Sequence, residues 1–307
     1  MERIGIIGGG LIGAGWAALF AHAGYAVDVL DPDQATAGRL DAVAATASRM
    51  LIETAGAHRG GSVKHVRDVE ALAGSDFVQE CLPETLRLKV DVLTSVEPVL
   101  AAGVPIASSS SGLDPDEIAA NLADPSRLLI GHPCNPPYLM PVVELVAGPR
   151  TSPDAVAMAR AVYEHAGRTV IVAGRTVPGH IVNRLQAALW REMLHLWQSG
   201  VADLDTLGLA VSRGLAPRWC VIGPTEVFQV AGGPQGIAGF CHALGPQVDR
   251  WWADLGAPRF DDALADTLIR ERGGASTAVL EDRRDAGVPL ILSCCEQAAR
   301  LPTTRED

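Results

Sequence analysis

A glycine-rich turn near the N-terminus constrains the fold of this chain most strongly. Gly8, Gly10 and Gly13 form a G-x-G-x-x-G pattern that follows the apolar run Arg3–Ile7 and precedes an expected helix, Ala14–Ala23. In a strand–turn–helix unit, these glycines permit a tight turn, a close approach to a pyrophosphate, and close helix–strand packing. The helix N-terminus adds free N–H groups that bind phosphates. The pattern predicts a dinucleotide site on the backbone of Gly8, Gly10, Leu11, Ile12 and Gly13.

An acidic residue lies where the second strand of such a fold ends. Asp31 follows the apolar run Ala26–Leu30, 18 residues after Gly13. A carboxylate there binds the ribose hydroxyls and repels a 2′-phosphate, which favours NAD over NADP. The following Pro32-Asp33 also fits a second interpretation, in which Asp31 is a turn or helix-capping residue.

The rest of the first half alternates short apolar runs with helical segments, which is typical of a parallel sheet covered on both faces. We expect helices over Ala35–Ile52 and Thr85–Leu100, and further strands over Asp76–Gln79, Pro105–Ala107, Leu128–Ile130, Val142–Val146 and Val170–Val172. From His180 onward the pattern is helical. The sequence therefore predicts a Rossmann-type, doubly wound, mainly parallel α/β domain over residues 1–178. An all-helical domain would follow over 179–307, with breaks at Gly223-Pro224 and Gly232–Pro234.

Composition excludes several classes of partner. The chain has 25 basic and 36 acidic residues, a net charge of −11, which disfavours nucleic acids and anionic membranes. Its six cysteines show no Cys-x-x-Cys spacing, so we expect reduced thiols and no metal site. The apolar stretch Ile4–Val27 imitates a signal peptide but holds seven glycines, so we expect a cytoplasmic protein.

Four polar features stand out in apolar surroundings. They are the serine run Ser108–Ser111, His132, Glu144 within an apolar β run, and Asn183 in the first turn of an expected helix, His180–Ser199. Serines also cap helices, and a histidine before proline is often structural. A buried glutamate needs a partner, and His132 is the obvious candidate because a carboxylate fixes the imidazole tautomer and raises its pKa.

The combination of motifs resembles the 3-hydroxyacyl-CoA dehydrogenase superfamily, and within it the branch of L-gulonate 3-dehydrogenase, or lambda-crystallin. The matching stretches are Gly8–Gly13, Gln79–Glu84 with Lys89, Ser108–Ser111, Gly131–Tyr138, Pro141–Val146, Gly179–Leu185 and Arg218–Pro224.

The resemblance implies a role for each matching residue. His132 would be the general base and acid of an NAD-dependent hydride transfer, and Glu144 would orient it. Ser111 and Asn183 would hydrogen-bond the reacting oxygen. Glu84 and Lys89 would contact the nicotinamide ribose. It also implies a non-catalytic crystallin as one alternative, although all four catalytic positions are filled here.

The sequence departs from the acyl-CoA enzymes at three positions. Ser109 replaces a usual asparagine, His180 replaces a usual phenylalanine, and Arg218 precedes Gly223-Pro224. An arginine can clamp a carboxylate in a bidentate manner, so Arg218 favours a free 3-hydroxy acid, such as L-gulonate or a short 3-hydroxy acid, over a thioester. Carnitine or another 3-hydroxy acid is a further alternative. A surface role for Arg218 and a (3S)-3-hydroxyacyl-CoA substrate remain the alternatives.

Two further expectations concern the helical half of the chain. Dehydrogenases resembling 6-phosphogluconate dehydrogenase use a lysine from this half, whereas the last lysine here is Lys89, so that class is disfavoured. The helix over His180–Ser199 is apolar around much of its circumference, which predicts a homodimer formed through this half.

Overall fold

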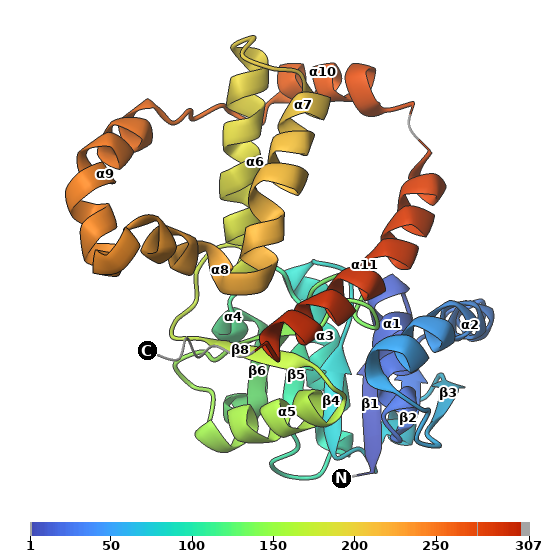
Figure 1. Cartoon of the computed structure of the whole chain (residues 1–307). Helices are drawn as coiled ribbons and strands as arrows, with labels where there is room; N and C mark the ends of the chain where they lie inside the picture. The colour runs from blue at the N-terminus through green and yellow to red at the C-terminus, as the bar shows by residue number, and fades with distance from the viewer. Residues whose placement is uncertain (1, 275, 302–307) are drawn as a thin grey trace. The chain divides into compact units, whose positions relative to one another are not determined.

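The computed structural model describes residues 2–274 and 276–301 (Figure 1). The chain separates into two compact units, one up to Arg184 and the other from Leu185 onward. The predicted domain boundary at residue 178 precedes this division, which lies within the expected helix His180–Ser199.

The first unit is built on a single eight-stranded sheet with the order β3-β2-β1-β4-β5-β6-β7-β8. The strands are β1 (Arg3–Ile7), β2 (Ala26–Leu30), β3 (Ser62–Val66), β4 (Phe77–Glu80), β5 (Ile106–Ser108), β6 (Leu128–Pro133), β7 (Val142–Val146) and β8 (Thr169–Ala173). Neighbouring strands are parallel throughout, except that β7 is antiparallel to β6. The chain order reverses between β1 and β4, and such a switch point is where this class of sheet binds ligands. The predicted Rossmann-type sheet is confirmed.

Helices cover both faces of this sheet. They are α1 (Leu11–His22), α2 (Thr36–Ala55), α3 (Leu86–Val96), α4 (Pro115–Ile118) and α5 (Pro153–His165), with the short 3-10 helices η1 (Val69–Leu72), η2 (Glu97–Val99) and η3 (Pro125–Arg127). On one face, Trp16 and Phe20 of α1 stack near Tyr163 of α5. On the other, side chains of α3 and α4 pack on the alternate strand residues, among them Val78 and Ile106.

Two elements differ from the expectations. Strand β3 was not expected, because its sequence Ser-Val-Lys-His-Val is half polar. It lies at the edge of the sheet, and its first three side chains are exposed. Helix α1 begins at Leu11 rather than Ala14, so Gly13 belongs to its first turn. Glycine early in a helix is tolerated when close packing requires it.

The second unit consists of helices. They are the remainder of α6 (Val182–Gln198), α7 (Leu204–Leu209), α8 (Ala216–Ala231), α9 (Gly236–Asp254), α10 (Asp262–Arg272) and α11 (Thr277–Ala299), with the short π-helix η4 (Ala210–Leu215) and the 3-10 helix η5 (Gly233–Gln235). Both predicted breaks are present. Helix α8 kinks at Gly223, which has a φ of 73° and precedes Pro224, and η5 separates α8 from α9 at Gly233. Within the described residues, no helix combines the length and apolar character needed to cross a membrane.

Helix α6 is less buried within the chain than its composition suggests. Leu194 is its buried residue, whereas Leu185 and Trp190 remain 67% and 44% exposed. Apolar side chains at such positions favour a contact with another molecule.

Candidate active site

The glycine turn forms an open cradle at the carboxyl end of β1. Gly8 has a φ of 96°, and a Cβ on Gly13 would lie 1.8 Å from the carbonyl oxygen of Gly8, so neither position accepts a side chain. A Cβ on Gly10 would meet nothing within 4 Å. Gly10 begins α1 without a side-chain cap, and Leu11 beside it is 60% exposed. The turn therefore leaves room and free helix N–H groups for a pyrophosphate, which fits NAD.

Asp31 and Arg39 hold this cradle from the second strand and the second helix. Asp31 Oδ2 accepts a hydrogen bond of 2.7 Å from the N–H of Gly9, and its Oδ1 accepts one from the N–H of Asp33. Arg39 donates to the carbonyl oxygen of Gly9 and pairs with Asp33. Asp31 thus acts as a turn residue through the N–H of Asp33, but it does not cap α2, whose N-cap residue is Ala35. Its carboxylate is half-buried, and its predicted contact with the ribose hydroxyls stays a prediction.

The register of the antiparallel pair β6–β7 brings His132 and Glu144 together. The two residues are directly paired across the strands, and His132 Nδ1 lies 2.7 Å from Glu144 Oε2. Both side chains are buried. Since a carboxylate only accepts, Nδ1 carries the proton and Nε2 of the neutral ring is the free base. The structure therefore joins the two residues that the sequence singled out.

The second oxygen of Glu144 is held by the start of α6. Oε1 accepts hydrogen bonds from the N–H groups of Ile181 at 2.7 Å and Val182 at 3.0 Å. These contacts attach the first turn of α6 to the sheet, which is why the first compact unit extends to Arg184. Asn183 follows in the same turn with an exposed side chain, next to the residues that fix Glu144.

Burial and charge act in opposite directions on the base. Burial is the largest influence and lowers the pKa of His132 below its ordinary value, whereas the hydrogen bond and charge of Glu144 raise it; His180 and Glu84 exert smaller effects, downward and upward. With a lowered pKa, His132 is neutral and able to accept a proton at neutral pH.

Glu84 organises the serine loop after β5. Its Oε1 accepts hydrogen bonds from Ser110 Oγ at 2.7 Å and from the backbone N–H groups of Ser111 and Gly112. Burial opposes the charge of Glu84, but the Ser110 hydrogen bond and the charge of Lys89 together lower its pKa. Ser111 is exposed, and its hydroxyl lies 3.3 Å from the same carboxylate oxygen. Its predicted contact with the reacting oxygen stays a prediction.

Lys89 lies inside the protein rather than on the cradle surface. Its Nζ donates to both oxygens of Glu80, at 2.8 and 3.0 Å, and to the carbonyl oxygen of Leu82. All three ammonium protons are thereby used, while Glu84 lies 3.6 Å away and keeps 40% of its side chain exposed. Of the two residues predicted to contact the nicotinamide ribose, Glu84 is the exposed one, and both contacts stay predictions. The pKa of Glu80 is raised, because the effect of burial is larger than the opposing effect of the Lys89 ammonium.

The sequence did not assign a role to His180, although it marked the position as unusual. Its ring is 5.2 Å from that of His132, and its Nε2 donates to the carbonyl oxygen of Ser110 at 3.0 Å. One set of contacts therefore runs from Glu84 through the serine loop and His180 to His132 and Glu144. The signal in the sequence was a histidine directly after Gly179, where the chain must turn into a helix.

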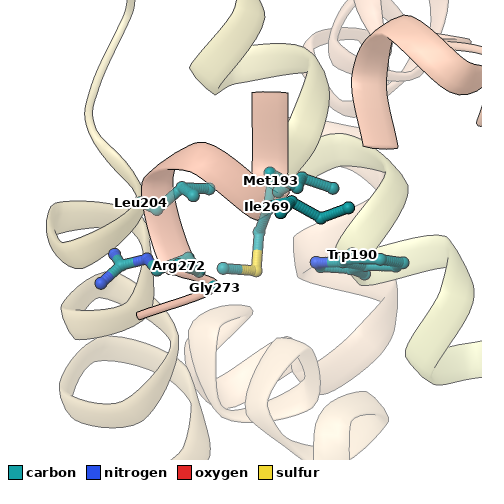
Figure 2. A pocket seen from close by; sticks show the side chains of 7 residues that line it. Trp190, Met193, Leu204, Ile269, Arg272 and Gly273 are labelled. Carbon is teal, nitrogen blue, oxygen red and sulfur yellow. The ribbon is translucent and has the colours of Figure 1, made fainter. Parts of the chain in front are cut away.

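The helical unit carries Arg218 and two hollows of its own. Arg218 is exposed on α8 and donates to the carbonyl oxygen of Gly214. One hollow of about 540 Å³ has a mainly apolar lining with a single arginine; Figure 2 shows the side chains that line it, which include Trp190, Met193, Leu204, Ile269 and Arg272. A second, lined by Arg213, Pro217, Leu290 and three cysteines, lies against α8. Arg218 lines neither.

Two family models together cover most of the chain. The NAD-binding domain of 3-hydroxyacyl-CoA dehydrogenase matches residues 3–176, and the C-terminal domain of the same enzyme matches residues 179–258. The chain belongs to the 3-hydroxyacyl-CoA dehydrogenase family. It is an NAD-dependent 3-hydroxy acid dehydrogenase, with the cofactor that the glycine turn predicted.

Curated relatives within this family match the chain along its whole length. The L-carnitine dehydrogenases of Streptomyces griseus and Streptomyces coelicolor are each 41% identical to it, over 100% and 95% of this chain and 93% and 94% of theirs. The L-carnitine dehydrogenase of Pseudomonas aeruginosa is 38% identical, over 97% of this chain and 95% of its own.

The chain is also similar in fold to solved structures of other dehydrogenases. A 5-formyl-3-hydroxy-2-methylpyridine 4-carboxylic acid 5-dehydrogenase, described as an NAD⁺-dependent dismutase, superposes with a TM-score of 0.86 at 27% identity, covering 96% of this chain and 99% of that one. The (S)-3-hydroxybutyryl-CoA dehydrogenase PaaH1 of Ralstonia eutropha gives a TM-score of 0.63 at 25% identity, over 78% and 85% of the two chains.

Proposed function

We propose that this family member oxidises a small 3-hydroxy acid with a free carboxylate to the 3-keto acid, and that L-carnitine is the first substrate to test. The similarity to L-carnitine dehydrogenases over the whole chain carries this proposal. Carnitine is a 3-hydroxy acid with an unesterified carboxylate, so it belongs to the substrate class that the sequence predicted from Arg218.

The His132–Glu144 pair performs the proton transfer in this proposal. Nε2 of His132 takes the proton of the substrate hydroxyl while the C3–H bond breaks. NAD, when bound, supplies the acceptor for the hydride. Glu144 holds Nδ1–H and stabilises the imidazolium that forms, and Oε1 stays fixed by the N–H groups of Ile181 and Val182. Ser111 and Asn183 hydrogen-bond the reacting oxygen.

Arg218 binds the substrate carboxylate in this proposal. Its exposed guanidinium has one hydrogen bond within its own segment, to Gly214, which leaves donors for a bidentate pair. Loss of a charge-assisted hydrogen bond costs about 1.5–3 kcal/mol, so Arg218→Ala is expected to raise KM about tenfold or more. Arg250→Ala, which removes another exposed arginine of the helical unit, is the matched control.

The rival substrates give separable results. A (3S)-3-hydroxyacyl-CoA thioester is supported by the family description and by the structural similarity to PaaH1. L-gulonate stays a prediction from the sequence. A crystallin-like protein would bind NAD and turn over none of these compounds.

A substrate panel tests the proposal. NADH formation is measured with L-carnitine, L-gulonate, free 3-hydroxybutyrate and its CoA thioester, each with NAD and with NADP. We expect kcat/KM for the best free acid to exceed that for the thioester by at least about a hundredfold, with NAD preferred. A preference for the thioester, or NAD binding without turnover, contradicts the proposal.

We also infer a homodimer in a reducing, cytoplasmic environment. Trp252, Val230 and Leu290 are each about 70% exposed in the helical unit, which favours a protein partner. The six cysteines are unpaired, which fits reducing conditions.

A further inference from the structure

His180 has an unusual backbone conformation directly in front of α6. Its φ is 49°, and no other non-glycine residue in the described ranges has a positive φ. The left-handed region is costly for a residue with a Cβ and persists where the surroundings hold it. The next two N–H groups in the chain, of Ile181 and Val182, are the ones that hold Glu144. The turn at His180 therefore determines how α6 meets the carboxylate of the catalytic pair.

The His180 side chain anchors this turn to the serine loop. The imidazole is only 2% exposed, and its Nε2 donates to the carbonyl oxygen of Ser110 at 3.0 Å. The same loop carries Ser111, whose N–H donates to Glu84. The ring thus connects the segment with the predicted oxygen-binding serine to the segment that fixes Glu144.

The other ring nitrogen of His180, Nδ1, is buried and has no hydrogen-bond partner among residues 2–274 and 276–301. The ring lies 5.2 Å from that of His132 at an angle of 54°. Since a carbonyl oxygen only accepts, Nε2 of His180 carries the proton that it donates to Ser110. A positive charge on a ring this close to His132 opposes protonation of His132.

We propose that His180 is a positioning residue for His132, which fixes the serine loop and the Glu144-binding turn around the base and limits proton uptake by the base at acidic pH. This inference rests on the proposed function for the role of His132.

The charged groups around His132 act in known directions. Glu144 on β7 and Glu84 after β4 favour its protonated form, and His180 before α6 opposes it. Cys134 lies two residues away on the same segment, but burial raises the pKa of its thiol, so it adds no charge near neutral pH. Of these groups, His180 is the one whose electrostatic effect opposes protonation of His132.

Two substitutions separate positioning from charge. His180→Gln places an amide nitrogen about where Nε2 lies, so it keeps the donor to Ser110 and removes the charge. His180→Phe keeps a planar ring but removes both the hydrogen-bond donor to Ser110 and the charge. We expect the Gln variant to retain most of kcat and the Phe variant to lose about tenfold or more, with NAD affinity unchanged in both.

The decisive readout is the titration of His132, followed by NMR of the imidazole signals in the substrate-free protein. The His132 signal is assigned by its disappearance in His132→Gln. In both His180 variants the midpoint should rise by about half a pH unit or more, because the electrostatic effect of His180, which lowers the pKa of His132, is removed. A midpoint that does not move in the Gln variant, or full kcat in the Phe variant, overturns the proposal. Since the titration requires no substrate, it tests His180 independently of whether the substrate panel succeeds.

Discussion

At the scale of single residues, the sequence predicted the pair at the centre of the site but not what holds it. His132 and Glu144 were both polar groups in apolar β runs, and the β6–β7 register makes them direct neighbours. The backbone donors of Ile181 and Val182 could not be predicted, because every residue except proline has a peptide N–H and the sequence does not show which ones are free to bind a side chain. For Lys89 the family motif predicted a contact with the cofactor, but its three ammonium protons are donated to Glu80 and to the carbonyl oxygen of Leu82.

Glu144→Gln tests how the carboxylate acts on its partner. Oxidation requires neutral His132, so kcat/KM rises as the pH rises through the pKa of His132. Burial lowers that pKa and Glu144 raises it, so removal of the charge should lower it further and move the acidic limb to lower pH. We expect kcat to fall about 10–100-fold, because the tautomer and the imidazolium lose their support. A limb that moves to higher pH, measured in kcat/KM profiles of both proteins, would contradict this account.

At the scale of elements, the strands with regular apolar patterns were predicted closely and the mixed ones were not. β1, β2 and β7 have the expected bounds, whereas the edge strand β3 was absent from the expectations because its polar residues face solvent. The glycine turn was predicted well because its conformation depends on the absence of side chains, which is visible in the sequence.

Gly10 and Gly13 offer a matched pair of alanine substitutions in this turn. A methyl group on Gly13 would collide with the Gly8 carbonyl oxygen at 1.8 Å, so Gly13→Ala should destabilise the fold by about 1–3 kcal/mol, measured by denaturant unfolding. A methyl group on Gly10 meets no protein atom within 4 Å, so Gly10→Ala should keep wild-type stability. It should nevertheless weaken NAD binding about tenfold or more in calorimetry, because the pyrophosphate needs that space. Unchanged NAD affinity in Gly10→Ala would place the cofactor elsewhere.

At the scale of the whole molecule, the sequence predicted a sheet domain and a helical domain but not the substrate. Residues such as Arg218 and Asn183 belong to different compact units, and specificity depends on how side chains from separate elements converge. The apolar circumference of the expected helix His180–Ser199 predicted a homodimer, which stays a prediction; Leu185 and Trp190 of α6 are exposed within the chain.

This exposed surface leads to a prediction about assembly. Burial of several large apolar side chains favours association strongly, at about 1.5–3 kcal/mol for each side chain fully covered. Light scattering should therefore give twice the chain mass at micromolar concentration, and Trp252→Glu with Val230→Glu should shift the protein toward the monomer. A wild-type protein of single-chain mass would contradict the dimer.

The central claim is that His132 is the base of the reaction, and the turnover of His132→Gln with NAD and the best free acid tests it most directly. His242→Gln, which alters an exposed histidine of α9, is the control for the substitution itself. We predict that kcat falls about 10²–10⁴-fold in His132→Gln, while NAD affinity stays within about twofold and the control keeps full activity. Turnover of His132→Gln within tenfold of the wild type would show that another group takes the proton.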